Sequence, residues 1–199
     1  MGNVFIEYSP KKILKKYTSD EKLISLLSDT FYDSPTYRET DRGTLDFEGA
    51  INAFEGVLPP DALSLLRQIH LGRSYAALDM TRIPEMRPVV AALKEKGLGV
   101  YLLSNAGPDF HDYKASIPGL ELMDGLFISC DCGYIKPEKE IYLLMLEKFN
   151  LQPQECVFFD DVSENVLAAR ECGINAVQYS SVKDGVPHLI GLLKQMNLL

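Results

Sequence analysis

Three sets of polar residues in the second half of the chain each follow or open a structural element in a way that suggests chemistry. The sets are Ser104-Asn105, Lys136 and Asp160-Asp161. Ser104-Asn105 and Asp160-Asp161 directly follow apolar runs, and Lys136 precedes a predicted helix. Because ligands of open α/β sheets bind beyond the carboxyl ends of the strands, we expect the three sets to converge. Together they offer a hydroxyl and an amide for phosphate oxygens, one cation, and two hard carboxylates that suit Mg²⁺.

Each set alone also fits a structural role. A Ser-Asn pair after a strand is a common turn signal, and Lys136 fits a solvated residue at a helix start. Asp160-Asp161 can cap the following helix, whose N-terminus favours anions, and Asn165 fits an exposed helical position. The combination, in this order along the chain, is therefore more informative than any single set.

The elements that must position these residues alternate between strands and helices from Arg82 onward. Short apolar runs predict strands near 99–103, 126–129, 156–160 and 175–179. Helical spacing, with Pro137 or glycine at the boundaries, predicts helices over 89–96, 137–149 and 163–172. This alternation predicts a parallel sheet with helices on both faces.

The first half of the chain has helical spacing instead. Apolar residues recur at three- and four-residue intervals, and helix-start signals precede the runs. The predicted helices lie near 12–17, 20–31, 47–57 and 61–71. We expect no strand between residues 10 and 75, so this half predicts a helical insertion.

Three segments with these motifs resemble the haloacid dehalogenase (HAD) superfamily of phosphohydrolases. "VYLLSN" resembles its second motif, "GYIKPEKEIY" its third and "CVFFDDVSENVLAAR" its fourth, and "GINAVQY" follows as in that superfamily. The resemblance covers Met86 to Tyr179. It implies an α/β, Rossmann-like parallel sheet with an inserted helical cap, divided into a core of residues 1–8 and 82–199 and a cap of residues 9–81.

The first motif of the superfamily is only half present. Met1-Gly2-Asn3-Val4 is similar to the second half of an Asp-x-Gly-Asn-Val pattern, which places the nucleophilic Asp one residue before Met1. Glu7 lies too far along and Asp20 fits a helix start, so neither substitutes. We expect a truncated form of an active enzyme that lacks the Asp-bearing first strand and has little or no turnover. An inactive relative is the alternative.

The resemblance also implies a mechanism and roles. An Asp forms an aspartyl-phosphate intermediate, and Mg²⁺ is held by Asp161 and the backbone oxygen of Gly2, with Asp160 supporting a bound water. Lys136 pairs with the nucleophile and the phosphoryl group, to which Ser104 and Asn105 donate hydrogen bonds. The catalytic set is thus Lys136, Ser104 and Asp160.

The expected substrate is a small phosphorylated metabolite, with sugar phosphates among the candidates. Arg42 and Tyr37 are possible substrate contacts from the cap, although both also fit solvated helix surfaces. Because Gly2 carries no side-chain acid, the group that protonates the leaving group is left open.

Other functions remain to be weighed. A response-regulator receiver uses similar side chains, but its acidic pair comes first in the chain, so we exclude it. A non-catalytic relative that binds a phosphorylated ligand or a protein partner stays open. Within the superfamily, a dehalogenase needs no metal, and the Asp160-Asp161 pair argues against one.

Composition narrows the class further. The 199 residues hold 20 Lys and Arg against 28 Asp and Glu, a net charge of −8, which argues against a nucleic-acid partner. No run approaches the ~18 apolar residues of a membrane span, and no secretory signal is visible, so we expect no membrane partner. Four cysteines are few for a disulfide framework, which favours a cytoplasmic location. The Cys130-x-Cys132 pair lacks a second pair at zinc spacing, and the three histidines are expected to be structural or exposed.

Overall fold

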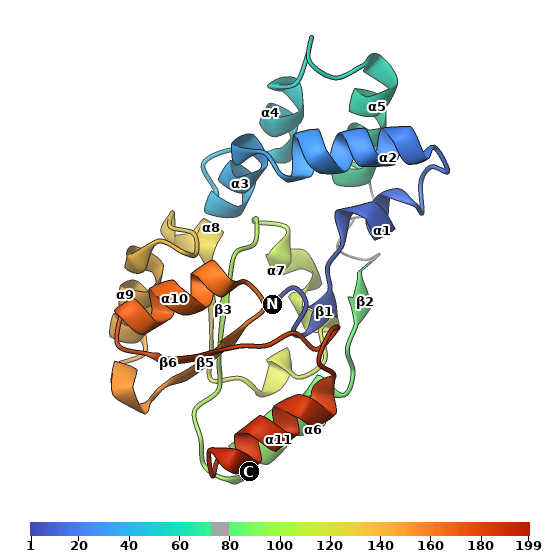
Figure 1. Cartoon of the computed structure of the whole chain (residues 1–199). Helices are drawn as coiled ribbons and strands as arrows, with labels where there is room; N and C mark the ends of the chain where they lie inside the picture. Colours follow the sequence, from blue (N-terminus) through green and yellow to red (C-terminus); the bar gives the residue numbers. More distant parts are fainter. Residues whose placement is uncertain (73–79) are drawn as a thin grey trace.

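The structure consists of a helical segment stacked on an α/β segment (Figure 1). This computed structural model describes residues 1–72 and 80–199, so residues 73–79 of the expected cap lie outside the described residues. Where the chain passes between the two segments, β1 (Ile6–Glu7) pairs antiparallel with β2 (Thr81–Arg82). Both strands lie outside residues 10–75.

The helical segment forms because apolar spacing and capping residues agree. Its elements are α1 (Pro10–Leu14), α2 (Glu21–Leu27), the π-helix η1 (Ser28–Tyr32), α3 (Pro35–Arg42), α4 (Phe47–Asn52) and α5 (Pro60–His70). The Asp20 side chain accepts hydrogen bonds from the Lys22 and Leu23 amides, and Asp46 accepts one from Gly49. The four predicted helices therefore exist: α1 and α5 begin slightly earlier than expected, α2 continues into the π-helix η1, and α4 ends earlier.

The helix α3 is an addition that apolar spacing does not predict. Thr40 is its only buried residue, so it carries no apolar stripe. Its ends do carry signals, because the Ser34 hydroxyl accepts from the Tyr37 amide and Gly43 closes the helix with a φ of 79°.

The helical segment has a hydrophobic core of its own. Its largest fully buried side chains are Leu14, Ile24, Leu27, Phe31, Ile51, Leu66 and Ile69. This cluster is separate from those of the α/β segment. The segment can therefore stay ordered while it contacts the α/β segment along one side, as a cap would; the exact division at residues 9 and 81 stays a prediction.

The α/β segment contains two parallel strand pairs. β3 (Tyr101–Ser104) pairs with β4 (Gly125–Ile128), and β5 (Val157–Asp160) pairs with β6 (Asn175–Gln178). All four strands lie within two residues of their predicted positions. Because Ser104 and Asp160 end β3 and β5, both lie at carboxyl ends of parallel strands.

Helices cover the strands on both sides, as the alternating pattern predicts. They are α6 (Met86–Glu95), α7 (Phe110–Tyr113), α8 (Ser129–Cys132), α9 (Lys139–Lys148), α10 (Ser163–Glu171) and α11 (Val186–Gln195), with 3₁₀ turns η3 (Lys114–Ser116), η4 (Leu120–Leu122) and η5 (Pro153–Glu155). Residues of α6 and α11 share one hydrophobic cluster and residues of α9 and α10 share another. Pro137 does not open α9 as expected, because it follows a cis peptide bond and the helix begins at Lys139. Within the described residues no helix is long and apolar enough to cross a membrane.

The expected single sheet of four strands is divided. Among the described strands, β3 pairs only with β4 and β5 pairs only with β6. An apolar cavity of about 470 Å³ lies between the pairs, lined by Leu102 and Leu103 of β3 and by Val157, Phe158 and Phe159 of β5. One edge of each inner strand thus faces this cavity, which we call the central groove.

Candidate active site

The centre of the site is an ion pair between Lys136 and Asp160. The Lys136 Nζ lies 2.6 Å from the Asp160 Oδ2, and the two residues are only 6% and 3% exposed. The ammonium also donates to the carbonyl of Leu103, 3.3 Å away, at the end of β3. Lys136 therefore joins the ends of the two strand pairs across the groove.

Asn105 fixes the loop that carries this lysine. Its Oδ1 accepts from the Lys136 amide at 2.8 Å and its Nδ2 donates to the Lys136 carbonyl at 3.0 Å. The neighbouring Ser104 hydroxyl, 1% exposed, donates to the carbonyl of Asn105. The structure thus brings Ser104, Asn105 and Lys136 together, as their positions after the strands predict.

Asp160 is held on its other oxygen by Asn165. The Asp160 Oδ1 accepts from the Asn165 Nδ2 at 2.8 Å and from the Val162 amide at 3.0 Å. Burial opposes ionisation, but Lys136, the N-terminal amine and Asn165 outweigh it and hold the pKa of Asp160 below its usual value. Both carboxylate oxygens are occupied, so Asp160 positions Lys136, and its role towards a metal-bound water stays a prediction. Asn165 is buried and not exposed, because β5 turns directly into α10.

Asp161 lies beside the first residues of the chain. The Asn3 Nδ2 donates to the Asp161 Oδ2 at 2.9 Å, and the Asn3 carbonyl accepts from the Ser181 amide at 2.8 Å. Because Gly2 precedes Asn3, this contact brings the start of the chain next to Asp161, and a metal held by Asp161 and the Gly2 backbone oxygen stays a prediction. Hard oxygen donors of this kind fit Mg²⁺. Asn3 was not singled out from the sequence, since its role depends on a partner 158 residues away.

The N-terminal amine of Met1 lies in the same site. It is buried near Lys136, Asp160 and Asp161. Burial, reinforced by the Lys136 ammonium, lowers the pKa of this amine to about 5, although both carboxylates oppose the shift. Met1 therefore lies where the central groove meets the Lys136 ion pair.

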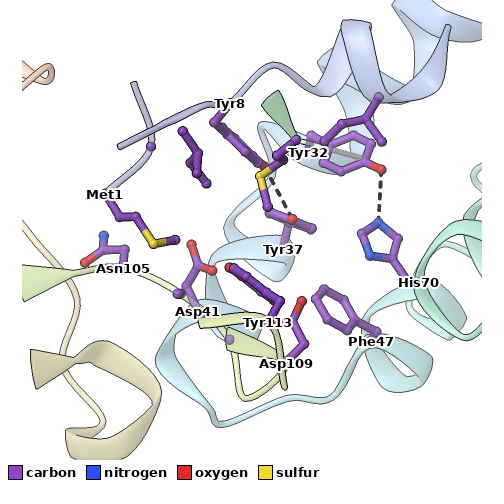
Figure 2. A pocket seen from close by; sticks show the side chains of 16 residues that line it. Met1, Tyr8, Tyr32, Tyr37, Asp41, Phe47, His70, Asn105, Asp109 and Tyr113 are labelled. Atoms are coloured by element: carbon purple, nitrogen blue, oxygen red, sulfur yellow. Dashed lines mark hydrogen bonds between the residues drawn. The ribbon is translucent and has the colours of Figure 1, made fainter. Parts of the chain in front are cut away.

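A pocket of about 140 Å³ lies between the α/β segment and the cap (Figure 2). The α/β side contributes Met1, Gly2 and Asn105, which lie next to the Lys136 ion pair. Aromatic side chains, most of them from the cap, also line the pocket. The lining aromatic residues are Tyr8, Tyr32, Tyr37, Phe47, His70 and Tyr113. Tyr37, a predicted cap contact, therefore lines the pocket, with its hydroxyl 3.4 Å from that of Tyr8.

Two carboxylic acids face this pocket. Asp41 comes from α3 of the cap and Asp109 from the loop before α7 (Figure 2). Burial, with the nearby Asp109 charge, raises the pKa of Asp41 to about 7, and Lys136 partly opposes the shift. Burial also raises the pKa of Asp109 to about 6. Sequence reasoning missed both, because only the folded chain brings α3 next to residue 109.

His70 lies at the cap end of the pocket and is buried as expected of a structural histidine. Its Nε2 lies 3.0 Å from the Tyr32 hydroxyl, and its ring stacks on Phe47 at 4.5 Å between centroids. Burial lowers the pKa of His70 to about 4, so the ring is neutral at physiological pH.

Arg42, the other predicted cap contact, does not line the pocket. Its guanidinium makes two hydrogen bonds, of 2.7 and 2.8 Å, to the carboxylate of Glu138 next to the Lys136 loop. It also donates to the Gly133 carbonyl at 3.1 Å. Arg42 therefore ties the cap to the α/β segment and is only partly solvated.

Comparison with known proteins decides the family. The sequence model of the haloacid dehalogenase-like hydrolases matches residues 17–173, most of the chain. The chain belongs to this family. The fold class expected from the three motifs, a HAD Rossmann-like parallel sheet with an added helical cap, is confirmed.

Relatives of this HAD-like hydrolase include phosphatases. It is 36% identical over 90 residues to the sesquiterpene phosphatase astK of Aspergillus oryzae, covering 45% of this chain and 46% of that protein. It is 32% identical over 90 residues to the D-ribitol-5-phosphate phosphatase of Bacteroides thetaiotaomicron, covering 42% of this chain and 44% of that protein. The matched part thus spans less than half the length of either relative.

A solved structure shares the whole fold of the HAD-like hydrolase. The HAD family enzyme bt-2542 of Bacteroides thetaiotaomicron, in complex with magnesium and inorganic phosphate, superposes with a TM-score of 0.68. The alignment covers 95% of each chain at 18% identity, which establishes a common fold.

Proposed function

We propose that this chain is a Mg²⁺-dependent phosphohydrolase that acts on small phosphomonoesters, sugar phosphates among them. The observation that carries the proposal is the buried Lys136–Asp160 ion pair, held by Asn105 beside a pocket under the cap. A buried cation whose position is fixed by several hydrogen bonds can stabilise phosphoryl oxygens without reorganising, and phosphoryl transfer depends mainly on such positioning.

Hydrogen-bond capacity supports the roles of the phosphate-binding residues. An ammonium has three N–H donors, and Asp160 and the Leu103 carbonyl accept from Lys136. One donor therefore remains for a phosphoryl oxygen. Asn105 uses one of its two Nδ2 hydrogens on the Lys136 carbonyl, and the Ser104 hydroxyl can rotate. Lys136 and Asn105 can thus donate to a phosphate without losing the contacts that place them, whereas Ser104 would exchange its bond to the Asn105 carbonyl for one to the phosphate.

The oxygen donors near Asn3 support a Mg²⁺ site. Asp161 accepts one hydrogen bond from Asn3, and its second oxygen has no partner among the described residues. This carboxylate and the backbone oxygen of Gly2 would hold the ion. When bound, Mg²⁺ would neutralise charge on the phosphoryl oxygens.

The central groove supports an aspartyl-phosphate route. It is apolar, is bordered by one open edge of β3 and one of β5, and ends at the Met1 amine next to Lys136. A parallel strand seated there and joined to Met1 would bring an Asp carboxylate to Lys136. Its oxygen would attack phosphorus, the bond to the leaving-group oxygen would break, and water would then hydrolyse the acyl phosphate to inorganic phosphate.

Asp41 is our candidate for the leaving-group acid that Gly2 cannot supply. It faces the same pocket as Gly2, and no described residue forms a hydrogen bond or ion pair with its carboxylate. A pKa near 7 keeps a large fraction protonated at neutral pH, as a proton donor requires.

The pocket lining supports a small leaving group. A volume of about 140 Å³, four tyrosine side chains and two carboxylic acids can accept a compact alcohol with several hydroxyl groups. Two relatives are named as phosphatases, one of D-ribitol-5-phosphate and one of a sesquiterpene. Their names support a phosphomonoester as the substrate class and leave the identity of its alcohol open.

Binding of inorganic phosphate tests the proposal directly. Calorimetric titration of residues 1–199 in the presence of Mg²⁺ should show one phosphate site, which Lys136→Met abolishes and Asp161→Asn weakens. Lys96→Met is the matched control because Lys96 is exposed at the end of α6. Equal phosphate affinity in the Lys136→Met variant would overturn the proposal.

A second candidate is binding of a phosphorylated ligand without turnover. Lys136 and Asn105 can donate hydrogen bonds to a phosphate, but neither side chain is a carboxylate that could form an acyl phosphate. Phosphate binding together with absent turnover, even after an Asp-bearing strand is added, would support this alternative.

A further inference from the structure

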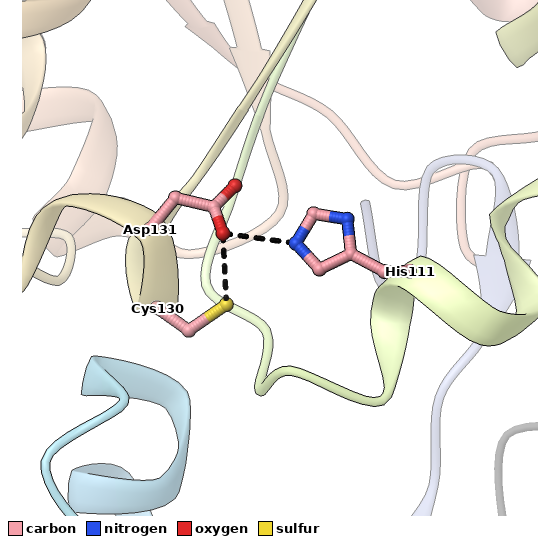
Figure 3. Close-up of side chains that lie close together, drawn as sticks. All are labelled: His111, Cys130 and Asp131. Carbon is pink, nitrogen blue, oxygen red and sulfur yellow. Dashed lines mark hydrogen bonds and ion pairs between the residues drawn. The ribbon is translucent and has the colours of Figure 1, made fainter.

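Three side chains with different donor atoms meet at the surface of the α/β segment (Figure 3). His111 belongs to α7, and Cys130 and Asp131 are consecutive residues of α8. One ligand atom of each, an imidazole nitrogen, a thiol sulfur and a carboxylate oxygen, lies within 4.8 Å of the others. The His111 and Asp131 side chains are 41% and 49% exposed, so an ion can reach them from solvent.

The measured distances are close to the edges of a tetrahedral zinc site. The His111 Nε2 lies 2.9 Å from the Asp131 Oδ1, and the Cys130 Sγ lies 3.7 Å from the same oxygen. Zinc bonds of about 2.0 Å to nitrogen and oxygen and about 2.3 Å to sulfur, at tetrahedral angles, place these atom pairs ~3.3 and ~3.5 Å apart. These two pairs need to move by only a few tenths of an ångström, and the third pair, the His111 nitrogen and the Cys130 sulfur, lies within 4.8 Å.

We propose that His111, Cys130 and Asp131 form a zinc site with three protein ligands and a fourth position open to water. The donor set selects the metal, because imidazole and thiolate prefer Zn²⁺, whereas Mg²⁺ prefers oxygen ligands. The site is therefore chemically distinct from the oxygen donors of Asp161 and Gly2. Cys132 is not part of this cluster, whereas Cys130, which the sequence analysis did not assign to zinc, is.

The Cys130 thiol has to lose its proton in order to bind zinc. Burial, together with the Asp131 carboxylate, raises the pKa of the Cys130 thiol to about 12. A zinc ion between the sulfur and the carboxylate would replace the thiol proton with a bond to the metal.

The site links the two helices that border the cap on the α/β side. Next to the ligands in α8, the Ser129 hydroxyl donates to the Asp41 carbonyl of the cap. Gly43 lies so close to α8 that an added Cβ would come within 2.7 Å of the Cys130 carbonyl. In α7, His111 follows Asp109, which lines the pocket. A bound ion would therefore hold α7 and α8 together and stabilise the border of the pocket.

Cobalt is a suitable probe because it replaces zinc and is coloured. Residues 1–199 are titrated with Co²⁺ in excess Mg²⁺ and a phosphine reductant, and Zn²⁺ is then added. We expect a thiolate-to-cobalt charge-transfer band at one equivalent, removed by one equivalent of Zn²⁺, and a rise in Tm with Zn²⁺. Binding that Mg²⁺ suppresses would overturn the proposal.

Variants identify the ligands. Cys130→Ser should abolish the band, and His111→Gln and Asp131→Asn should weaken Co²⁺ binding at least about tenfold, since even residues that only support a metal ligand contribute that much. The controls Cys132→Ser, Asp112→Asn and His188→Gln should bind like the unmodified chain. The Tm of each variant without metal shows whether it is folded. A band that survives Cys130→Ser in folded protein, or is lost equally in Cys132→Ser, would exclude the site.

Discussion

Lys136 and Asp160 form a 2.6 Å ion pair with side chains that are 5% and 4% exposed, although they follow different strand pairs. Neither charge has access to water that could replace its partner. The pair therefore couples the stability of the fold to the position of the cation that we assign to phosphate binding.

Asp160→Asn should destabilise the protein by about 3–5 kcal/mol, because it leaves the Lys136 ammonium buried without a counter-charge. Urea denaturation followed by circular dichroism measures the change. The control Glu171→Gln removes the exposed partner of Lys139 and should cost far less, because water screens a surface ion pair. Equal losses in the two variants would contradict the assignment of a buried pair.

His70 should make stability depend on pH. Its folded-state pKa of about 4 lies below the ordinary value of 6.5, so the unfolded chain binds the proton more tightly. Stability contributed by the neutral ring is present above pH 6.5 and is lost as the pH falls towards 4. Between pH 7.5 and 5 the loss should be about 2 kcal/mol.

His70→Gln, which keeps an acceptor for the Tyr32 hydroxyl, should lack that acid-dependent loss, as measured by urea denaturation at both pH values. His188→Gln replaces an exposed histidine and should keep it. Asp41 and Asp109 have raised pKa values, so they change the free energy of unfolding with pH in the opposite direction. Both are present in all of these proteins, so their contribution cancels in the comparison. The same pH dependence in all three proteins would exclude His70 as its source.

Local sequence predicts the strand positions and the meeting of Ser104, Lys136 and Asp160. Apolar runs of about four residues define the strands, and parallel strands bring their carboxyl ends to one edge. The helix α3 escapes apolar spacing because most of its residues are only partly buried, and only the caps Ser34 and Gly43 reveal it.

Features that depend on distant pairs could not be predicted. Asn3 meets Asp161, Asp41 faces Asp109 and His111 meets Asp131 only after the chain has folded. Likewise, the open edges of β3 and β5 are invisible in a single sequence, since each strand is locally normal and its partners are set by topology.

Adding a strand should change both activity and stability. Residues 1–199 alone should show no appreciable phosphatase turnover, because Ser104, Lys136 and Asp161 can bind a phosphoryl group but none supplies an attacking carboxylate. An N-terminal extension of apolar residues ending in Asp should bring Mg²⁺-dependent hydrolysis of an aryl phosphate. It should also raise Tm, since the strand pairs with the open edges of β3 and β5 and fills the groove.

The matched control is the same extension ending in Asn. It should raise Tm to a similar degree without turnover, which separates filling the groove from supplying the nucleophile. Robust turnover by residues 1–199, abolished by Asp161→Asn, would refute the proposed nucleophile position and mean that another residue attacks.

In the extended, active form, Asp41→Asn should affect substrates according to their leaving group. An alkoxide leaving group needs a proton, whereas nitrophenolate departs without one, so kcat/KM should fall about 10²–10⁴-fold for an alkyl phosphate and far less for nitrophenyl phosphate. With the pKa of Asp41 raised to about 7, the protonated acid is lost as pH rises through that value. Alkyl phosphate hydrolysis by the unmodified enzyme should therefore decline above pH 7.

The Asp109→Asn variant tests whether Asp41 is the proton donor and Asp109 only raises the pKa of Asp41. Removing the Asp109 charge lowers the pKa of Asp41, so this variant should keep the leaving-group preference and shift the alkaline decline to lower pH. Four other ionisable side chains lie around Asp41, namely those of Lys136, Tyr8, Tyr37 and Tyr113. Burial raises the pKa values of the three tyrosines well beyond this range. If Asp41→Asn slows both substrates equally and leaves the pH profile unchanged, Asp41 positions the cap and another group protonates the leaving alcohol.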